Sequence, residues 1–321
     1  MTKTITLIYG DGIGQEVIPA TQAVIEALSL DIDIQIAEAG FTTFERRGTA
    51  LPAETIAYCE ASDAILFGAT QSPMTKVEGY YSPILALRKH FGLYANLRPA
   101  IQGDIDLLVV RENSEGLYSG RENLSDDGDT AITERIITRH ASERIVRIAC
   151  DYAQERRGKL TIVHKANVLK ETCGLFRQVA LEVASEYPNL DIEEMLVDAC
   201  AMRMAQDASP FDVIVSTNLF GDILSDLAAG LTGGLGIAPS ANIGGRIGLF
   251  EPVHGSAPDI AGTGTADPRA SILSASMLLN YLGFTGIAHN LQHITYNTQH
   301  SGNTSTTTQN IINAVLEVQT S

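Results

Sequence analysis

Short apolar runs alternate with amphipathic stretches along most of the chain. Runs rich in β-branched residues predict strands at residues 4–9, 32–37, 64–67, 107–110, 159–163 and 211–218, and residues 127–137 alternate as expected of a β arm. Apolar residues recurring every three or four positions predict helices at residues 52–59 and 141–156, and from the glycine turn at 10–14 to about residue 30. This alternation predicts an α/β fold with a mostly parallel sheet core.

A pair of carboxylates stands out within residues 218–245, NLFGDILSDLAAGLTGGLGIAPSANIGG. Asp222 and Asp226 are four residues apart, so they share one face of the predicted helix. Such a pair is either a solvated surface pair or a place where a cation or an arginine balances the charge. The apolar neighbours and the glycine-rich loop favour a metal site, and oxygen ligands suit Mg²⁺ or Mn²⁺. Asp198, within the apolar stretch IEEMLVDACAMRMA, is a third candidate ligand.

Three arginines stand at the ends of predicted elements: Arg88, Arg98 and Arg111. Taken singly, each could be an ordinary surface ion pair. Guanidinium groups, however, suit two-pronged recognition of carboxylates. Three of them beside a candidate metal site predict a polycarboxylate substrate.

Lys165 follows a predicted strand that ends at residue 163, in the text HKAN. It is either an ordinary exposed lysine or a reactive one, since desolvation readily shifts a lysine pKa. At the N-terminus, the turn GDGIG resembles a dinucleotide fingerprint, but that fingerprint needs glycine where Gln15 stands. The turn is therefore predicted to be structural.

Composition narrows the class of protein. The chain has 321 residues, 45% of them hydrophobic, which predicts two domains. A formal charge of -16 argues against binding nucleic acid or anionic membranes. The four cysteines form no CxxC pair and are expected to be reduced and buried. The N-terminus lacks the features of a signal peptide and no apolar run is long enough to span a membrane, so we expect a cytoplasmic protein.

Specific motifs cover almost the whole chain: GDGIG, LYANLRP, VVREN followed by EGLYSG, HKANVLK, NLFGDILSD and EPVHGSAPDIAG. With these motifs the chain resembles the β-decarboxylating dehydrogenases, the group of isocitrate, isopropylmalate and homoisocitrate dehydrogenases. The resemblance implies a two-domain α/β subunit of that fold, distinct from a true Rossmann fold. It implies a cofactor-binding domain of residues 1–97 with 233–321, and a second domain, 98–232, that carries metal-binding residues and forms a homodimer, possibly within a tetramer.

The resemblance also assigns roles to residues. It implies an acid at Tyr118, a base at Lys165, and metal ligands at Asp198, Asp222 and Asp226, with Lys165 and Asp198 serving the neighbouring subunit's site. Substrate contacts fall on Arg88, Arg98, Arg111, Ser82, Ile84 and Leu85. Cofactor contacts fall on Thr70, Asn167, His254, Gly255, Ser256, Ala257, Asp259 and Asp267.

Two features depart from the family pattern. Asp267, in GTADP, occupies a slot near the adenine where the family usually has asparagine, which adds a charge and is expected to weaken cofactor binding. Residues 295–308 lack the family's DLGG, and a polar run of this kind is typical of a mobile loop.

The cofactor and substrate are predicted from single positions. The carboxylate of Asp259 suits the ribose hydroxyls of NAD⁺ and would repel a 2′-phosphate. Ile84 replaces an asparagine usual in isocitrate enzymes, while Ser82, Tyr80 and Tyr81 are more polar than an isopropyl pocket requires. The longer stretch KVEGYYSPILALRK resembles homoisocitrate dehydrogenases most, and this resemblance implies homoisocitrate, converted to 2-oxoadipate, ahead of isocitrate and then isopropylmalate. A silent regulatory subunit is the non-enzymatic alternative, but the acid, base, metal and arginine positions are all present.

Overall fold

The computed structural model describes residues 2–71, 73–75 and 77–320, which form two compact units. The first unit comprises Met1–Phe91 with Gly234–Ser321, and the second comprises Gly92–Gly233. The first boundary lies six residues before the one predicted at residue 97, because the strand β4 (Ala95–Gln102) pairs along its length with β5 (Ile105–Glu112) and so belongs to the second unit.

In the first unit the strand order is β2-β1-β3-β12-β11. All neighbours are parallel except β11 and β12, which are antiparallel. The strands are β1 (Lys3–Gly10), β2 (Ile32–Ala37), β3 (Ala64–Ala69), β11 (Pro239–Ile243) and β12 (Gly248–Pro252). Strand β3 is buried along its whole length, as expected of a central parallel strand.

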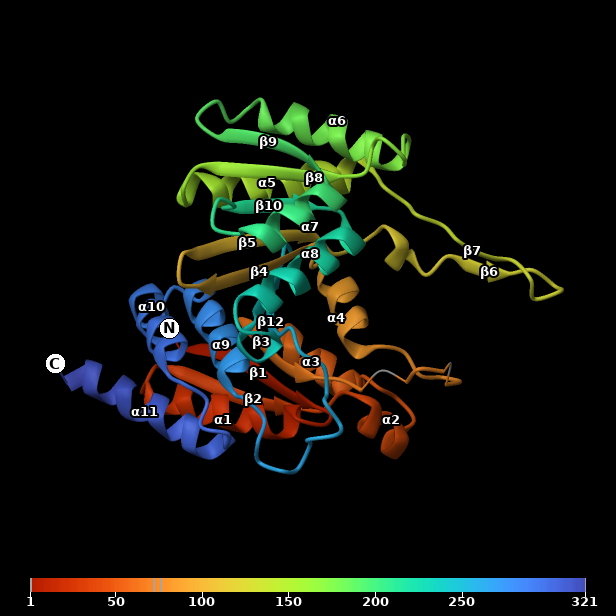
Figure 1. The fold of residues 1–321 in the computed structure, drawn as a ribbon. Coiled ribbons are helices and arrows are strands. Elements are labelled where there is room, and N and C mark those ends of the chain that lie inside the picture. Colours follow the sequence, from red (N-terminus) through yellow and green to blue (C-terminus); the bar gives the residue numbers. More distant parts are fainter. Residues whose placement is uncertain (1, 72, 76, 321) are drawn as a thin grey trace. The chain divides into compact units, whose positions relative to one another are not determined.

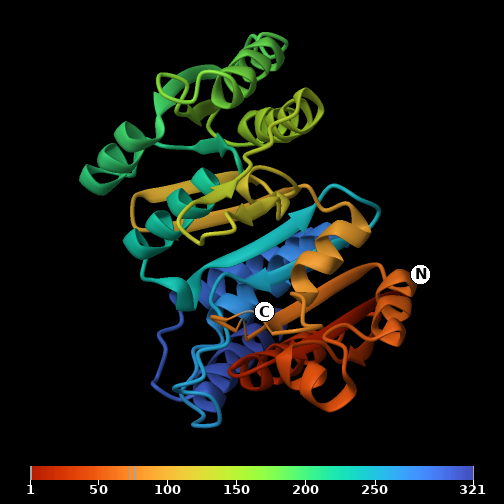
Figure 2. The same cartoon turned by 90° about the vertical axis from the view of Figure 1, so that its right-hand side faces the viewer.

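The helices of the first unit cover this sheet. They are α1 (Gly14–Ala27), α2 (Phe41–Arg47), α3 (Ala53–Ala61), α4 (Pro83–Phe91), α9 (Arg269–Tyr281), α10 (Thr285–Asn297), α11 (Thr304–Thr320) and the 3₁₀ turn η2 (Leu235–Ile237). Helices α1 and α9 pack on each other and on the sheet, and α11 packs on α1. The first and last segments of the chain, red and blue, therefore lie side by side within this unit (Figures 1 and 2).

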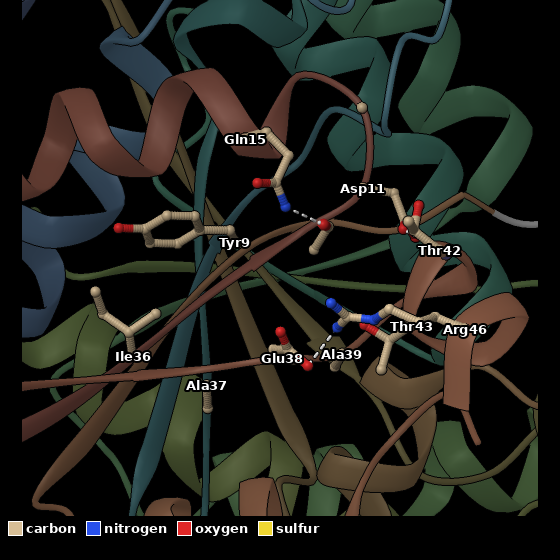
Figure 3. Close-up of a pocket in the computed structure, with 12 residues that line it drawn as sticks. Tyr9, Asp11, Gln15, Ile36, Ala37, Glu38, Ala39, Thr42, Thr43 and Arg46 are labelled. Carbon is tan, nitrogen blue, oxygen red and sulfur yellow. Dashed lines mark hydrogen bonds and ion pairs between the residues drawn. The ribbon is translucent and has the colours of Figure 1, made fainter. Parts of the chain in front are cut away.

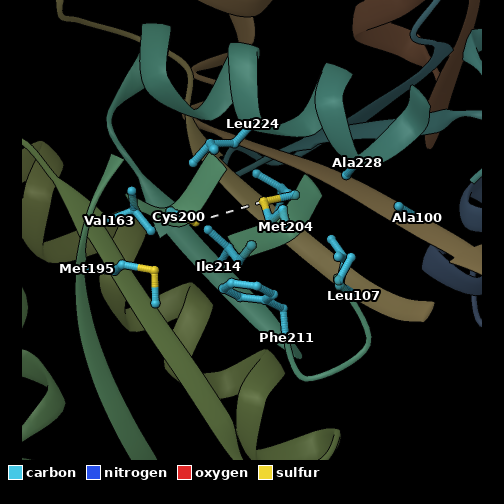
Figure 4. Packing of buried hydrophobic residues seen from close by; sticks show 12 residues of the cluster. Ala100, Leu107, Val163, Met195, Cys200, Met204, Phe211, Ile214, Leu224 and Ala228 are labelled. Atoms are coloured by element: carbon cyan, nitrogen blue, oxygen red, sulfur yellow. Dashed lines mark hydrogen bonds between the residues drawn. The ribbon is translucent and has the colours of Figure 1, made fainter. Parts of the chain in front are cut away.

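In the second unit the strand order is β4-β5-β10-β8-β9, with β4 antiparallel to β5 and the others parallel. The remaining strands are β8 (Lys159–His164), β9 (Asp191–Leu196) and β10 (Val213–Ser216), and the helices are α5 (Arg139–Glu155), α6 (Thr172–Ala184), α7 (Val197–Gln206) and α8 (Asn218–Leu231). Helices α7 and α8 pack on each other and on the sheet through an apolar cluster that includes Cys200, Met204, Ile214 and Leu224 (Figure 4). This packing fixes the face that α8 presents.

The predicted β arm is a hairpin that projects from the second unit (Figure 1). Its strands, β6 (Glu122–Leu124) and β7 (Ala131–Thr133), pair antiparallel, so the hairpin begins earlier in the chain than the pattern at 127–137 indicated.

The prediction of a mobile loop over residues 295–308 was wrong. Helix α10 continues to Asn297 and α11 begins at Thr304, so only six residues separate the two helices. The threonine hydroxyls donate to backbone carbonyls: Thr304 to Ala266 and Thr308 to Thr304, at 2.6 and 2.7 Å. A threonine-rich stretch can therefore be helical and partly buried, because each hydroxyl is satisfied by the backbone.

All four cysteines are buried and free, as predicted. Burial raises the pKa of the Cys59, Cys150 and Cys200 thiols to about 12, so these thiols are unreactive at neutral pH. In the described part of the chain no helix has the length and apolar character needed to cross a bilayer.

Candidate active site

Helix α8 presents a polar stripe made of Asn218, Asp222, Ser225 and Asp226. These positions recur at the helical repeat and share one face, while Leu224 and Ala228 face the apolar cluster. The Asp222 side chain is 28% exposed and that of Asp226 is 53% exposed. The two aspartates are therefore neither fully buried nor an isolated surface pair.

Two predicted substrate arginines face this stripe from the β4–β5 hairpin. Arg98 Nη1 lies 3.0 Å from Asp226 Oδ1 and 3.1 Å from Asp222 Oδ1, and it donates to Ser225 Oγ at 2.8 Å. Arg111 Nη1 donates to Asp222 Oδ1. Both guanidinium groups are almost buried, with 10% and 3% of the side chains exposed. The structure thus brings two predicted arginines and two predicted metal ligands into one cluster.

Gly221 permits this close approach. A Cβ atom at this position would lie 2.8 Å from Arg111 Cγ and 2.9 Å from Arg111 Cβ. Any larger residue would therefore push α8 away from the strand that carries Arg111. The sequence could have indicated this contact, because a glycine within a predicted helix usually permits close packing.

Tyr118, the predicted acid, joins the cluster from η1 (Leu117–Ser119). Its hydroxyl donates to Asp222 Oδ2 at 2.8 Å, and the Arg111 guanidinium lies 5.1 Å from the centre of its ring. Burial raises the pKa of the Tyr118 phenol, and the hydrogen bond to Asp222 raises it further. The phenol therefore stays protonated at neutral pH and can act as a proton donor.

Lys165 and Asp198 form a separate pair. Lys165, one residue after β8, donates from Nζ to Asp198 Oδ1 at 2.5 Å, and Asp198 lies in the first turn of α7. The Asp198 carboxylate is 66% exposed. Among the described residues no three His, Cys, Asp or Glu side chains of the one chain are grouped so that they could hold a metal. Asp198 is thus not gathered with Asp222 and Asp226 within a single chain.

The donor set on α8 still suits a divalent cation. Asp222 and Asp226 supply only oxygen atoms, which Mg²⁺ and Mn²⁺ prefer, and Mg²⁺ commonly uses one or two protein carboxylates while leaving positions for water and substrate. Their partial exposure leaves room for such ligands.

The third predicted arginine lies in the first unit. Arg88 Nη2 donates to Glu251 Oε1 at 2.8 Å, and both side chains are 12% exposed. The same carboxylate oxygen accepts from Asn242 Nδ2 at 2.8 Å. Glu251 therefore holds Arg88 in place, and the sequence had not singled it out.

The other predicted substrate residues lie at the start of the same helix as Arg88, with Ser82 directly before its first residue. Ser82 Oγ accepts from the Leu85 amide at 3.5 Å, Ile84 is partly buried and Leu85 is 46% exposed. The neighbouring tyrosines use their hydroxyls within the unit, since Tyr80 donates to Gln71 O at 2.9 Å and Tyr81 lies 3.4 Å from Leu51 O. The polarity of this turn therefore depends chiefly on Ser82.

The predicted cofactor loop, residues 254–259, lies against the glycine turn. The Ile13 amide donates to Ser256 O at 2.9 Å, and a Cβ atom on Gly12 would lie 2.0 Å from that oxygen. Ala257 has φ 37, a left-handed conformation that is rare for a residue with a side chain. The buried His254 Nε2 atom has no hydrogen-bond partner within the described chain. An unsatisfied donor or acceptor in a strained loop fits a site that binds a polar ligand such as a nucleotide.

The glycine turn also borders a cavity of about 440 Å³ in the first unit, lined by residues that include Tyr9, Gln15, Glu38 and Arg46 (Figure 3). Gln15 Nε2 donates to Gly10 O at 2.6 Å, so the side chain that breaks the dinucleotide fingerprint closes the turn instead. Asp11 is 2% exposed and accepts from the amides of Phe41, Thr42 and Gln71. The turn is thus structural, as predicted.

The remaining predicted cofactor residues are at the ends of strands and in loops. Thr70 follows β3, Asn167 follows β8 in the second unit, and Gly255 and Asp259 are exposed in the loop after β12.

The charge that Asp267 adds near the predicted adenine site is paired with an arginine. Arg269 donates to both of its oxygens, with the Nη2–Oδ2 distance at 2.8 Å, and His300 Nδ1 lies 3.9 Å from Oδ1. Residues 264–266 of the same loop accept hydrogen bonds from Thr304, so the two departures from the family pattern lie together. The charge of Asp267 is therefore balanced within the chain.

Comparison with known proteins shows the family of the chain. A family model described as isocitrate/isopropylmalate dehydrogenase matches residues 4–321. The chain belongs to the isocitrate/isopropylmalate dehydrogenase family. It is 53% identical over 291 residues to an isocitrate/homoisocitrate dehydrogenase of Thermus thermophilus, covering 88% of this chain and 86% of that one.

Other relatives span the same family. A 3-isopropylmalate dehydrogenase of Archaeoglobus fulgidus is 48% identical over 309 residues, covering 94% of this chain and 92% of the relative. The crystal structure of isocitrate dehydrogenase from Methylococcus capsulatus has a TM-score of 0.92 and 40% identity, covering 98% and 99% of the two chains. The chain is thus a β-decarboxylating dehydrogenase with the fold predicted from its sequence, in a family that acts on polycarboxylates with NAD(P) and a divalent metal.

Proposed function

We propose that this dehydrogenase oxidises and decarboxylates homoisocitrate with NAD⁺, with isocitrate as its second substrate and 3-isopropylmalate as a poor one. The observation that carries this choice is the turn of α4 before Arg88. Ile84 and Leu85 precede Arg88 by four and three residues, so they share its helix face, and Ser82 directly precedes the helix. Homoisocitrate has one methylene more than isocitrate before its distal carboxylate. Ile84 packs on that methylene and the Ser82 hydroxyl donates to the carboxylate.

Two further facts support this order of substrates. A relative that is 53% identical is named for both isocitrate and homoisocitrate. One methylene changes binding by only about 1 to 3 kcal/mol, so measurable turnover of isocitrate is expected.

The test is to measure kcat/KM for the three acids with NAD⁺ and Mg²⁺, following nicotinamide absorbance. Ile84→Asn adds a hydrogen-bond donor and is expected to shift the ratio toward isocitrate by about tenfold. Lys89→Gln, an exposed change on the same helix, is the matched control and should leave the ratio unchanged. A wild-type enzyme that prefers 3-isopropylmalate would contradict the proposal, and one that prefers isocitrate would show that Ile84 does not select the longer acid.

The α8 cluster, together with Arg88 and Lys165, is proposed to supply the chemistry of this reaction. Arg88, Arg98 and Arg111 bind the carboxylates of the substrate. Lys165 removes the proton of the hydroxyl group as hydride leaves for the nicotinamide, which gives a β-keto acid. Carbon dioxide then departs, and the protonated Tyr118 delivers a proton to the carbon left behind.

Asp222 and Asp226 would hold a divalent ion, which would supply positive charge beside the substrate hydroxyl and beside the negative charge left by decarboxylation. Asp259 with the loop at residues 254–257 would bind the adenosine of NAD⁺, which would supply the hydride acceptor.

We further propose a homodimer in which Lys165 and Asp198 act in the partner subunit's site. Asp198 lies outside the Asp222 cluster of its own chain, which supports a shared site. Mixing Tyr118→Phe with Lys165→Met subunits should restore part of the activity, because half of the sites in a heterodimer then carry neither change. No recovery, with subunit exchange demonstrated by mass spectrometry, would contradict shared sites.

A further inference from the structure

Arg98 and Arg111 are each held along one edge by the side-chain amide of an asparagine. Arg111 donates from Nε and Nη2 to Asn218 Oδ1, at 3.1 and 2.7 Å. Arg98 donates from Nε to Asn96 Oδ1 at 2.7 Å. Asn96 is 0% exposed and Asn218 is 2% exposed, so both contacts are shielded from water. A buried asparagine oxygen thus holds each arginine, from β4 in one case and from α8 in the other.

These contacts determine where the other edge of each guanidinium points. The group is planar, and its donors form a fork of fixed geometry. Once the inner edge is held, Nη1 of each arginine is directed at Asp222, and Nη1 of Arg98 also at Asp226. Asn218 is itself fixed, because its Nδ2 donates to Glu115 O at 3.1 Å.

The side chains that hold Arg98 and Arg111 are neutral amides rather than carboxylates. A carboxylate would bind a guanidinium more strongly than an amide does. The same chain uses a buried carboxylate elsewhere, where Asp212, 1% exposed, accepts from Arg156 at 2.8 Å. At Arg98 and Arg111 the inner acceptor is uncharged instead.

An uncharged acceptor preserves the positive charge that a polycarboxylate requires. The two guanidinium groups already balance the carboxylates of Asp222 and Asp226. A third carboxylate behind either arginine would leave the cluster with net negative charge in a poorly screened place. It would then repel an anionic substrate.

We propose that Asn96 and Asn218 are positioning residues that align Arg98 and Arg111 without neutralising them. This inference rests on the proposed function, because it requires a substrate with several carboxylates. It assigns specificity for anionic substrates to two residues that lie behind the arginines.

The test compares Asn218→Asp and Asn96→Asp with the exposed control Asn290→Asp on α10. KM and kcat are measured for homoisocitrate and isocitrate, the dissociation constant for isocitrate with Mg²⁺ by calorimetry, and Tm by scanning calorimetry. Both aspartate variants should raise KM and Kd by about tenfold or more, because the added carboxylate neutralises the guanidinium in front of it and repels an anionic substrate. The control should leave KM and Kd unchanged.

Asn218→Ala separates alignment from charge, because it removes the acceptor and adds no carboxylate. It is expected to lower kcat more than it raises KM, the reverse of Asn218→Asp. If the asparagines were merely structural, all variants would lower Tm while KM and Kd of the folded enzyme stayed within twofold of wild type. That result would overturn the inference.

Turnover tests the proposed function, and the calorimetric Kd tests the role of the two asparagines. A wild type that oxidises none of the three acids contradicts the function, and the calorimetric Kd values then still decide the inference. Aspartate variants that bind isocitrate at least tenfold more weakly than wild type support it, and equal values overturn it. A wild type that does not bind isocitrate at all overturns both.

Discussion

The two units hold their candidate site residues by different means. In the second unit, side chains hold side chains: Arg111 is fixed by Asn218 and Asp222, and Tyr118 by Asp222. In the first unit the backbone holds the predicted cofactor loop, since the Ile13 amide donates to Ser256 O and Gly12 lies against the same carbonyl. A charge in the α8 cluster can therefore be altered while the neighbouring side chains keep the shape of the site, whereas an added Cβ atom on Gly12 would displace the cofactor loop.

The largest effect is expected from Asp222→Asn, which removes a charge and keeps the shape. Asn218 still holds Arg111, so the fold should survive. Turnover should fall by at least about 10²-fold, because the lost carboxylate is a proposed metal ligand and electrostatic groups of this kind contribute that much. Steady-state kinetics measures the loss of turnover, and circular dichroism and Tm show whether the fold is retained.

Asp104→Asn, in the exposed turn between β4 and β5, is the control for the same chemical change. Wild-type activity should also cease in excess chelator. Full activity under chelation would show that the α8 carboxylates do not act through a metal.

Gly12→Ala should show the opposite behaviour, a loss of stability that precedes any loss of chemistry. Gly12 has φ +55, and the new Cβ would lie 2.0 Å from Ser256 O. Gly48→Ala is the matched control, since Gly48 has φ +72 and no neighbouring atom within 4 Å of such a Cβ. The control should lose about 1–2 kcal/mol from the left-handed backbone alone.

Urea unfolding measures both variants, and Gly12→Ala should be clearly the less stable. It should also bind NAD⁺ more weakly, because the loop at residues 254–259 loses its support. Equal losses in the two variants would mean that the contact with Ser256 contributes nothing.

Asp259→Lys tests whether a single charge in the first unit determines the choice between NAD⁺ and NADP⁺. The carboxylate is exposed and is proposed to accept from ribose hydroxyls. Exchanging it for a cation should move the ratio of kcat/KM for NAD⁺ over NADP⁺ toward NADP⁺ by about tenfold or more. Asp31→Lys, an exposed change of the same charge, should leave the ratio unaltered. A wild type that already prefers NADP⁺ would refute the assignment.

The smallest effect concerns His164, beside Lys165. The ring is 3% exposed, Nδ1 accepts from the Ala166 amide at 3.1 Å, and the pKa is lowered chiefly by burial, with Glu194 opposing and Arg177 adding to the shift. A histidine with a lowered folded-state pKa binds its proton more readily when unfolded. The stability that depends on neutral His164 is therefore complete above about pH 6.5 and is lost as pH falls below it.

His164→Asn keeps an acceptor for the Ala166 amide and removes the titration. The fall in Tm between pH 7.5 and pH 5.5 should be smaller than in wild type, whereas the exposed control His289→Asn should behave as wild type. An unchanged pH dependence in His164→Asn would assign the acid sensitivity to other groups.

The local periodicity of the sequence was sufficient to predict single helices and strands and the faces that they present. The spacing of Asp222 and Asp226 placed them on one helix face, and the run at residues 64–67 predicted the buried strand β3. Motif resemblance supplied the family and the candidate roles. These signals are contained within short segments, where the geometry of a helix or strand relates neighbouring residues directly.

Local composition was a poor guide where side chains bond to their own backbone. The threonines after residue 303 suggested a loop, yet their hydroxyls are satisfied inside α11. Asp267 was recognised as an added charge, but its partner Arg269 was not. In both cases the polar group has a partner that composition does not reveal.

The tertiary structure alone decided which groups stand behind the predicted ones. Asn218 and Arg111 are 107 residues apart in the chain, and Arg88 and Glu251 are 163 apart. No local period relates such positions, because the strand pairing and helix packing between them set the distance. The sequence by itself determined the fold class, the family and the charged residues of the candidate site. The tertiary structure determined which neutral or oppositely charged side chain contacts each of these residues, because those contacts depend on the packing of the whole unit.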